Sequence, residues 1–512
     1  MNLDKNDYAY LERHGIDKDQ VNEQIRNFEK GFPFIRLEAP ATLGKGIVSL
    51  SEQELDQYVG LYESQGRNLD ILKFVPASGA ASRMFKDLVD FEMKCHVPEQ
   101  IEEFQEAKKC LTNLPHFAFL DSLRSKLRKN DLSYDELVGK QDYKTLARFI
   151  LKPEGLDYQK RPKAMVAFHK YAEEVRTSME EHLVEGAAYA SNQNNEVNLH
   201  FTISPEHRPL FEKKLASVQS YYEEKYDVHY NISFSEQKPQ TDMLAVDMQG
   251  ELVRKPDGEL LLRPGGHGSL IENLNDCNAD LIFIKNIDNV TVDRLRDTTI
   301  RYKKALAGYL LQIRNEVYGH LEKLETLQVN DADLSMIESM ARLHLGIQVS
   351  MAYFGKTLQE KVIFWKKKLN RPIRICGMVR NEGEPGGGPF WVNDGNGEKS
   401  LQVVESSQID ASNAQQMNLL AQSTHFNPVD LVCCTKNYKG NKFFLPKYIN
   451  QKTGFISKKK QNGIEMRIQE RPGLWNGAMA DWITVFVEVP VETFTPVKML
   501  SDLLRKEHQG LE

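Results

Sequence analysis

The sequence predicts an α/β fold with a mixed sheet, and three features of the chain support this prediction. Residues 71–75 form an apolar run that predicts a core strand. Hydrophobic residues alternate over 197–203 and again over 228–234, with a helical pattern over 209–226 between them. A continuous apolar run at 281–284 is typical of a strand buried on both faces. Strands and helices that alternate in this order predict helices layered against a sheet.

The remaining elements follow in chain order. Residues 1–66 are charged and predict a helical N-terminal extension. Residues 67–330 predict the core of the fold, with a polar, helical insertion at about 87–160. Residues 331–512 predict a helical segment, then strands and loops, and a C-terminal strand and helix.

Composition limits the class of protein. The chain has 512 residues, of which 41% are hydrophobic and 27% are charged, enough for a large core and two or three lobes. Its 66 basic and 72 acidic residues give a net charge of -6, so no overall positive field attracts nucleic acid or an acidic membrane. The one dense basic run, at 458–460, predicts a solvated turn. We expect neither nucleic acid nor membrane as a partner.

Cysteine usage and the N-terminal residues indicate a compartment. The six cysteines show no Cys-x-x-Cys spacing, which argues against a disulfide framework or structural zinc and predicts reduced thiols. Residues 1–7 lack the apolar core of a signal peptide, and no stretch approaches the apolar length of a membrane span. We therefore expect a cytoplasmic protein, whose oligomeric state the sequence leaves open.

The stretch from Arg263 to Val290 joins a glycine-rich turn, a short helix, a buried strand and a carboxylate. Glycines in the turn let the backbone approach a ligand closely. Asp288 follows the strand, and the carboxyl ends of strands are where open α/β sheets bind ligands. Asp288 is thus placed to hold a divalent cation against phosphates, and the combination predicts a nucleotide site. The simpler alternative is a polar loop with a capping aspartate.

A second small-residue turn and several short motifs recur in known enzymes. The turn Ala77-Ser78-Gly79-Ala80-Ala81-Ser82-Arg83 could cradle a phosphate chain, and Pro162-Lys163 lies beyond the insertion. Further motifs, in chain order, are Phe234-Ser235-Glu236-Gln237, Pro264-Gly265-Gly266-His267-Gly268, Asn286-Ile287-Asp288-Asn289, Val403-Val404-Glu405, Phe426-Asn427 and Phe494-Thr495-Pro496-Val497-Lys498.

Through these motifs the chain resembles the nucleotide-sugar pyrophosphorylases, especially the eukaryotic-type UDP-glucose and UDP-N-acetylhexosamine enzymes. It is also similar to an uncharacterised Bacteroidetes family related to them. The resemblance implies a GT-A-like (Rossmann-like) nucleotidyltransferase core. Residues 67–330 would then form the nucleotide-binding core, and 331–512 would include its sugar-binding part. The chain departs from the usual pattern at Ser78 and Ala81, where two glycines are expected.

The implied reaction joins a nucleoside triphosphate, with UTP expected first, to a sugar-1-phosphate and releases pyrophosphate. Magnesium is the implied cofactor, held by Asp288, with Asp481 before the apolar run 483–489 as a candidate second ligand. The resemblance gives the catalytic cations as Arg83, Lys163 and Lys498. It gives the nucleotide-binding residues as Ser78, Gly79, Gln237, Gly266 and Gly268, and the sugar-binding residues as His267, Glu405 and Asn427.

Other interpretations remain open at this stage. Each cation could be an ordinary surface residue, and His267 could be a solvated loop histidine. A GT-A glycosyltransferase is one alternative, although it would normally carry Asp-x-Asp at a strand end. A catalytically inactive or regulatory nucleotide-binding protein is another, because the β-carbons of Ser78 and Ala81 could crowd a triphosphate. The base and the sugar are not determined by the sequence.

Overall fold

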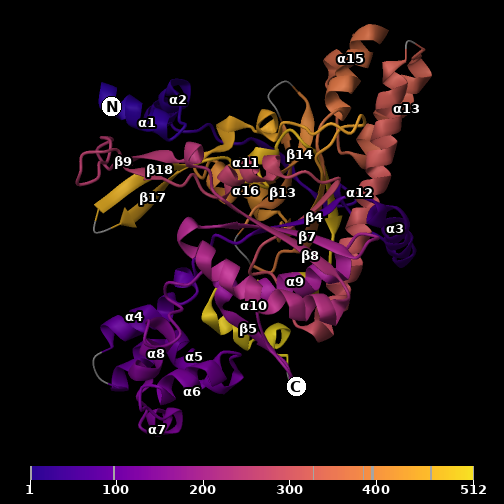
Figure 1. Cartoon of the computed structure of the whole chain (residues 1–512). Coiled ribbons are helices and arrows are strands. Elements are labelled where there is room, and N and C mark those ends of the chain that lie inside the picture. The colour runs from indigo at the N-terminus through magenta and orange to yellow at the C-terminus, as the bar shows by residue number, and fades with distance from the viewer. Residues whose placement is uncertain are drawn as a thin grey trace. The chain divides into compact units, whose positions relative to one another are not determined.

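The computed structural model describes residues 3–510 except 96–97, 327, 384–385, 394–396 and 462–463 (Figure 1). The chain forms two compact units. Unit 1 comprises Met1–Ile71, Ser235–Ile284 and Lys304–Val489, and unit 2 comprises Leu72–Phe234, Lys285–Lys303 and Pro490–Glu512. Both units are discontinuous in sequence. Each of the predicted segments 1–66, 67–330 and 331–512, in contrast, is one continuous stretch of the chain.

The α/β fold is confirmed, with a mixed and mostly parallel main sheet. In unit 1 the strand order is β2-β3-β19-β12-β16-β11, and β15 pairs with β12. Strand β12 runs parallel to β19 and antiparallel to β16, and β19 runs parallel to β3. The bounds are β2 Thr42–Leu43, β3 Gly46–Val48, β11 Leu281–Lys285, β12 Ile373–Arg380, β15 His425–Phe426, β16 Asp430–Cys434 and β19 Ile483–Glu488.

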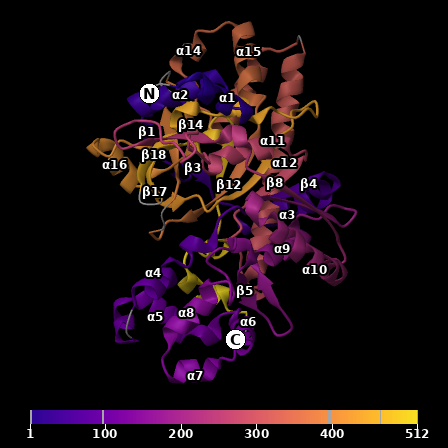
Figure 2. The same ribbon diagram turned by 60° about the vertical axis from the view of Figure 1, so that its left-hand side comes forward.

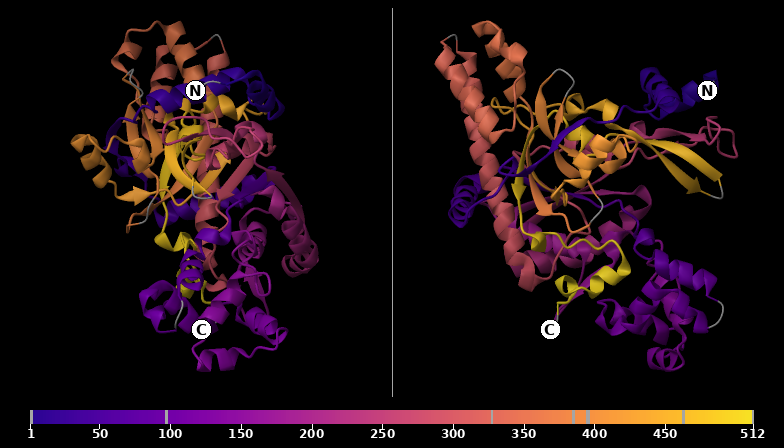
Figure 3. Two further views of the ribbon diagram at one scale, coloured as in Figure 1. Left: turned by 90° about the vertical axis from the view of Figure 1, so that its left-hand side faces the viewer. Right: turned by 180° about the vertical axis from the view of Figure 1, so that it is seen from behind.

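Two smaller sheets also belong to unit 1, in the orders β1-β13-β14 and β10-β9-β18-β17. Figure 3 shows β17 and β18 as a long antiparallel pair. The bounds are β1 Leu37–Pro40, β13 Gly388–Asn393, β14 Lys399–Val404, β9 Met243–Asp247, β10 Leu262–Arg263, β17 Phe455–Gln461 and β18 Ile464–Glu470.

The helices with residues in unit 1 include α1 and α2 at the N-terminus, which Figure 2 shows. They pack against β9 through a shared hydrophobic cluster. The bounds are α1 Lys5–Arg13, α2 Lys18–Lys30, α3 Glu52–Gln65, α11 Ile271–Asp276, α12 Arg296–Glu325, α13 Asp331–His344, α14 Met351–Phe354, α15 Leu358–Leu369 and α16 Ala414–Ala421.

In unit 2 the strand order is β4-β7-β8, with β4 parallel to β7. Helices α9 and α10 pack with β7 and β8 in one hydrophobic cluster. A separate pair, β5-β6, precedes α9. The bounds are β4 Ile71–Pro76, β5 Ala167–Lys170, β6 Val175–Thr177, α9 Ser178–Tyr189, β7 Glu196–Ile203, α10 Arg208–Tyr226 and β8 His229–Glu236. These are the strand, helix and strand expected over 197–234.

The helical insertion expected at about 87–160 is present in unit 2. Its helices are α4 Lys86–Lys94, α5 Gln105–Thr112, α6 Leu120–Arg128, α7 Tyr134–Gly139 and α8 Tyr143–Leu151. Their apolar faces form a hydrophobic core that also takes in Val290, Val497, Leu500 and Leu503. The segment after β11 and the C-terminal segment are therefore anchored on this helical core.

The N-terminal region corrects the prediction of a largely helical extension. Helices α1, α2 and α3 are present, but residues 37–48 form three short strands. Strand β1 pairs with β13, and β3 pairs with β19, at partners more than 340 residues away. A local hydrophobic pattern does not reveal such pairing, because most of its stabilisation comes from the distant strand.

Two further expectations are settled by the structure. The lysines at 458–460 lie in strand β17 with exposed side chains, not in a turn. All six cysteines are free thiols. Across the described residues, no helix combines the length and apolar character needed to cross a membrane.

Candidate active site

The turn at 77–83, which we call the opening turn, connects β4 to the helical insertion in unit 2. Ser78, Gly79 and Arg83 are exposed in it. The backbone N–H of Lys163 donates to the carbonyl of Gly79 at 3.1 Å. The backbone N–H of Ala81 donates to the carbonyl of Arg161, also at 3.1 Å. The Pro162-Lys163 motif is thus fixed beside the opening turn, although the insertion separates them in sequence.

Asp288 lies at the centre of a cluster of opposite charges in unit 2. Its Oδ2 accepts hydrogen bonds from Nζ of Lys163 at 2.8 Å and Nζ of Lys498 at 2.9 Å. The side chains of Asp288 and Lys163 are 9% and 12% exposed, whereas that of Lys498 is 59% exposed. The structure thus brings together three residues that were predicted separately, and we call them the Asp288 cluster.

The cluster holds its carboxylate in the charged form. Burial by itself raises the pKa of Asp288, but the ammonium groups of Lys498 and Lys163 lower it more, so the net shift is downward. Two ammonium groups against one carboxylate leave the cluster with an excess positive charge. Such an excess beside an exposed backbone turn suits a phosphate-bearing ligand.

The C-terminal segment is fixed around this cluster by backbone contacts. The N–H of Val497 donates to the carbonyl of Asp288 at 3.0 Å, and the carbonyl of Val497 accepts from Lys163 Nζ at 2.8 Å. The buried carboxylate of Asp502 accepts from the backbone N–H groups of Lys498 and Met499 at 2.7 and 2.8 Å. These contacts set where the Lys498 side chain leaves the backbone.

The donor set fits a magnesium ion only if phosphates supply most of its ligands. Asp288 provides one carboxylate, and across the described residues no group of three or more His, Cys, Asp or Glu is arranged to hold a metal. Mg²⁺ in nucleotide enzymes is commonly bound by one or two carboxylates plus substrate phosphates. Asp481 lies in unit 1, is 68% exposed and pairs with Arg371 at 3.2 Å.

The glycine turn at 264–268 lies in unit 1, and its glycines have a structural role. A Cβ on Gly268 would lie 2.0 Å from the carbonyl oxygen of Pro472, and one on Gly265 would lie 2.7 Å from that of Thr241. Gly266 adopts φ +79°, which favours glycine. The backbone that lies close to Gly265 and Gly268 therefore belongs to Thr241 and Pro472 of the same unit.

His267 is held in this turn and is not a freely solvated histidine. Its ring stacks on Trp475 with centroids 4.4 Å apart and planes 20° from parallel. Burial lowers the pKa of His267, although Glu405 and Glu470 oppose the shift. A neutral imidazole can donate or accept a hydrogen bond without presenting a charge.

The other residues expected to bind sugar lie near His267 in unit 1. Glu405 accepts a hydrogen bond at 2.5 Å from Nδ2 of Asn476. Asn476 directly follows Trp475, the residue on which His267 stacks. The backbone N–H of Asn427 donates to Gly387 at 2.8 Å, and a Cβ on Gly387 would lie 3.5 Å from Glu405. Sequence reasoning missed Trp475 and Asn476, which follow the turn Pro472-Gly473 and carry no known motif. Gln237, expected to contact the base, donates to Asp242 at 3.4 Å.

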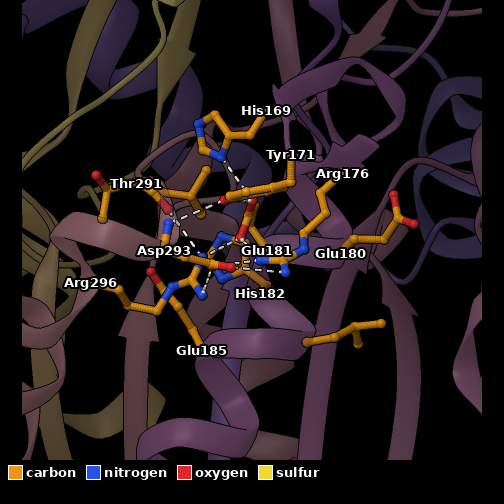
Figure 4. A network of polar contacts seen from close by, with 12 residues as sticks. His169, Tyr171, Arg176, Glu180, Glu181, His182, Glu185, Thr291, Asp293 and Arg296 are labelled. Atoms are coloured by element: carbon orange, nitrogen blue, oxygen red, sulfur yellow. Dashed lines mark hydrogen bonds and ion pairs between the residues drawn. The ribbon is translucent and has the colours of Figure 1, made fainter. Parts of the chain in front are cut away.

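A buried network of charged residues in unit 2 was also missed. Glu181 of α9 is fully buried, and its carboxylate contacts His169, Arg176 and Arg296. Asp293 bridges the two guanidinium groups, and Figure 4 shows these side chains gathered around Glu181. Burial raises the pKa of Glu181, but Arg296 and His169 outweigh it and lower the pKa. Charged residues on a helix normally predict an exposed face, so the sequence gives little signal of this network.

Helix α9 holds both ends of the segment that carries Asp288. At one end Lys285 donates to Glu185 at 2.6 Å, and at the other Arg296 pairs with Glu181. Between them, Nε2 of His182 lies 3.2 Å from the carbonyl of Asn286 and 3.3 Å from that of Ile287.

Both partners of His182 Nε2 are acceptors, so this nitrogen must carry the proton. Burial lowers the pKa of His182 well below its usual value, which keeps the ring neutral. His182 therefore holds the backbone immediately before Asp288 as a neutral donor.

Known structures resemble this chain only distantly. The UDP-glucose pyrophosphorylase from Leishmania major is 11% identical with a TM-score of 0.43, and the alignment covers 98% of this chain and 79% of that one. A UDP-glucose phosphorylase from Trypanosoma brucei is 12% identical with a TM-score of 0.44, and the alignment covers 97% and 77%. Function must therefore be argued from this chain's own residues.

The curated proteins include none that matches the chain. A family described as "Domain of unknown function (DUF4301)" matches residues 4–509, nearly the whole length. This match agrees with the expected membership of an uncharacterised family. The chain belongs to the DUF4301 family.

Proposed function

We propose that this protein is a magnesium-dependent nucleotidyltransferase. It transfers a nucleotidyl group from a nucleoside triphosphate, UTP being the first to test, to a sugar-1-phosphate and releases pyrophosphate. The observation that carries the proposal is the convergence of Lys163 and Lys498 on Asp288, with Lys163 fixed to the opening turn. All of these residues belong to unit 2.

The opening turn offers a surface for a phosphate chain. Ser78, Gly79 and Arg83 are exposed, and a Cβ on Gly79 would meet nothing within 4 Å. Ala81 is fully buried and belongs to the hydrophobic core of the helical insertion. Its methyl group therefore takes no room on the exposed side of the turn. Arg83 would donate from its planar guanidinium to the terminal phosphates.

The chemical step needs little covalent help from the protein. An oxygen of the sugar-1-phosphate forms a bond to the α-phosphorus while the bond from that phosphorus to the α–β bridging oxygen breaks. The electron pair of that bond leaves with pyrophosphate, and no proton transfer is required. Lys163 and Lys498 would neutralise charge on the transferring group and on the sugar phosphate, which is where such enzymes gain most of their rate.

Asp288 would hold the magnesium ion, which would supply Lewis-acid polarisation of the phosphoryl oxygens. Its Oδ2 is now shared by two ammonium groups, so the phosphates would draw at least one lysine away when they bind. Lys498 is the lysine with the more exposed side chain. Asp481 is not part of the proposed magnesium site, because its exposed carboxylate pairs with Arg371.

In unit 1, His267, Glu405 and Asn427 are proposed to contact the sugar, and Gln237 to contact the base. Oε1 of Glu405 accepts a hydrogen bond from Asn476, and this hydrogen bond orients the carboxylate to accept from sugar hydroxyls. Gly266 and Gly268 are proposed to bind the nucleotide, in addition to their structural role in the glycine turn.

The proposal is tested by measuring pyrophosphate release with magnesium over a matrix of nucleoside triphosphates and sugar-1-phosphates. Release confined to one pair is the expected result and would name both substrates. A folded protein that releases none with any pair would contradict the proposal. Calorimetric titration of the same nucleotides then distinguishes a binding protein from one with no nucleotide site.

A further inference from the structure

Helix α13 in unit 1 has two apolar faces. Leu334, Ile337, Met340 and Ala341 are buried on one face and account for its packing against the rest of the unit. On the other face, Met336 is 58% exposed and Leu343 is 66% exposed. Among the described residues, none buries Met336 or Leu343 on this second face.

The exposed residues follow a spacing that is typical of helix pairing. Ala332, Met336, Ser339 and Leu343 are separated by four, three and four residues, the a and d spacing of a coiled-coil seam. Ala332 is also exposed, and Ser339 is half-buried. We call these four residues the α13 seam.

The next two helices of unit 1 carry further exposed apolar residues. Met351 and Phe354 on α14 are exposed, at 84% and 54%, as are Leu358 and Ile363 on α15. Helices α13 and α15 lie against each other, as Figure 1 shows. Exposed apolar residues that gather on neighbouring helices are typical of interaction sites.

The charges around the seam favour a second copy of the same helix. Helix α13 has Asp331 and Asp333 in its first turn and Arg342 and His344 in its last turn. An antiparallel copy brings the acidic end of each helix to the basic end of the other. A two-fold axis perpendicular to the helix imposes this antiparallel arrangement, and it uses the same patch on both molecules. Helix α15 repeats the polarity, with Glu360 first and Lys366, Lys367 and Lys368 last.

We propose that the α13 seam is the interface of a two-fold homodimer of this chain. Placing Ala332 opposite Leu343 of the second copy puts Met336 opposite Ser339 of that copy. Small residues then face large ones along the seam, so the two helices can approach closely. A membrane surface is the poorer occupant, because it would call for a basic rim, whereas this rim carries both signs.

The proposal is tested by sedimentation of the full-length protein over a range of concentrations. The wild type is expected to sediment as a dimer, and Met336→Glu/Leu343→Glu as a monomer. Met93→Glu is the matched control, because Met93 on α4 is as exposed as Leu343, at 66%. It should remain dimeric. A wild type that is monomeric at every concentration, or a dimer that survives the double substitution, would overturn the proposal.

A charge reversal tests the antiparallel orientation. Arg342→Glu alone should weaken the dimer several-fold, because it faces the acidic first turn of the second copy. Asp331→Lys/Arg342→Glu should recover part of the affinity, because it also makes the facing first turn less acidic, although Asp333 stays opposite position 342. An equal loss in the single and double variants would contradict the antiparallel arrangement. Binding of a monomeric wild type to anionic vesicles would point to a membrane surface instead.

Discussion

At the scale of single residues, two ammonium groups hold the carboxylate of Asp288 in its charged form, although its side chain is only 9% exposed and burial opposes the charge. Asn at this position keeps the shape of the side chain and removes its charge. Asp288→Asn should therefore lower turnover by about two orders of magnitude or more, as expected for loss of a main electrostatic group, while the protein stays folded. Steady-state kinetics and circular dichroism measure the two effects.

The matched control for that change is Asp481→Asn in unit 1. Its carboxylate is largely exposed and pairs with Arg371, so we expect turnover close to that of the wild type. A loss of magnesium affinity in Asp481→Asn would reinstate it as a second metal ligand. Unchanged turnover in Asp288→Asn would rule out the Asp288 cluster as the reaction centre.

His182 is a positioning residue, because it touches the backbone before Asp288 and not the carboxylate. His182→Leu should lower kcat by roughly tenfold or more with a smaller change in KM, in line with residues that orient a metal ligand. His182→Gln offers an amide N–H near the position of Nε2 and should recover part of the rate. Equal losses in both variants would show that only packing matters. NMR of the imidazole, expected to report the neutral Nε2–H tautomer, does not depend on the proposed activity.

At the scale of elements, α9 carries the buried network, and its first turn is closed by a capping box. Thr177 accepts from the backbone of Glu180 at 3.3 Å, and the Glu180 carboxylate accepts from the Thr177 backbone at 2.8 Å. Thr177→Ala should cost about 1 kcal/mol of stability, the typical loss for an N-cap. Thr357→Ala is the matched control, because it removes the corresponding capping box of α15.

Chemical denaturation and kinetics distinguish the two variants. Both should lose stability, but only Thr177→Ala should also lose activity, because only α9 holds the segment with Asp288. Equal activity in the two would argue that α9 does not position that segment.

Replacement by alanine should affect stability at Gly268 but nucleotide binding at Gly79. A Cβ on Gly268 would overlap the carbonyl of Pro472 at 2.0 Å, so Gly268→Ala should be strongly destabilising. Gly79→Ala meets nothing within 4 Å and should leave the melting temperature unchanged, but it should weaken nucleotide binding if the opening turn holds phosphate. Calorimetric titration checks the second effect, and unaltered affinity would remove the turn from the site.

At the scale of the whole molecule, buried ionisable groups predict a loss of stability in acid. Burial lowers the pKa of His182 and His508 well below their unfolded value of 6.5, so the unfolded chain binds more protons as the pH falls below 6.5. The lowered pKa of Glu181 adds stability that is present above its unfolded value of 4.5 and is lost as the pH falls through its folded pKa. The melting temperature should therefore start to fall near pH 6.5 and fall further below pH 4.5. The variant His182→Gln should show a shallower fall between pH 6.5 and 5, and an unchanged slope there would contradict the assignment.

Parts of this molecule were predictable from the sequence where the signal is local. Strand β11 is apolar at consecutive positions, and the alternation in β7 directly marks which side chains face the core. Strands β1 and β3 were missed, because pairing with the distant strands β13 and β19 determines them. Strand β17 pairs with its neighbour β18 and was missed for another reason, because the lysines at 458–460 interrupt any alternation of hydrophobic residues. Within the site, Asp288 and Lys498 could be found from short motifs, and Lys163 lies beside the opening turn despite the intervening insertion. The α9 network could not be found, because nothing in Glu181, His182 or Glu185 alone distinguishes a buried ion pair from a solvated helix face.

The central claim is the transfer of a nucleotidyl group, and ³¹P NMR of the α-phosphorus tests it most directly. With magnesium, a sugar-1-phosphate and the matching nucleotide, the α-phosphorus signal should move from that of a triphosphate to that of a sugar diphosphate. Pyrophosphate should appear in equal amount, and Asp288→Asn should abolish both changes. Release of orthophosphate alone, or unchanged spectra with folded protein and every substrate pair, would contradict the claim.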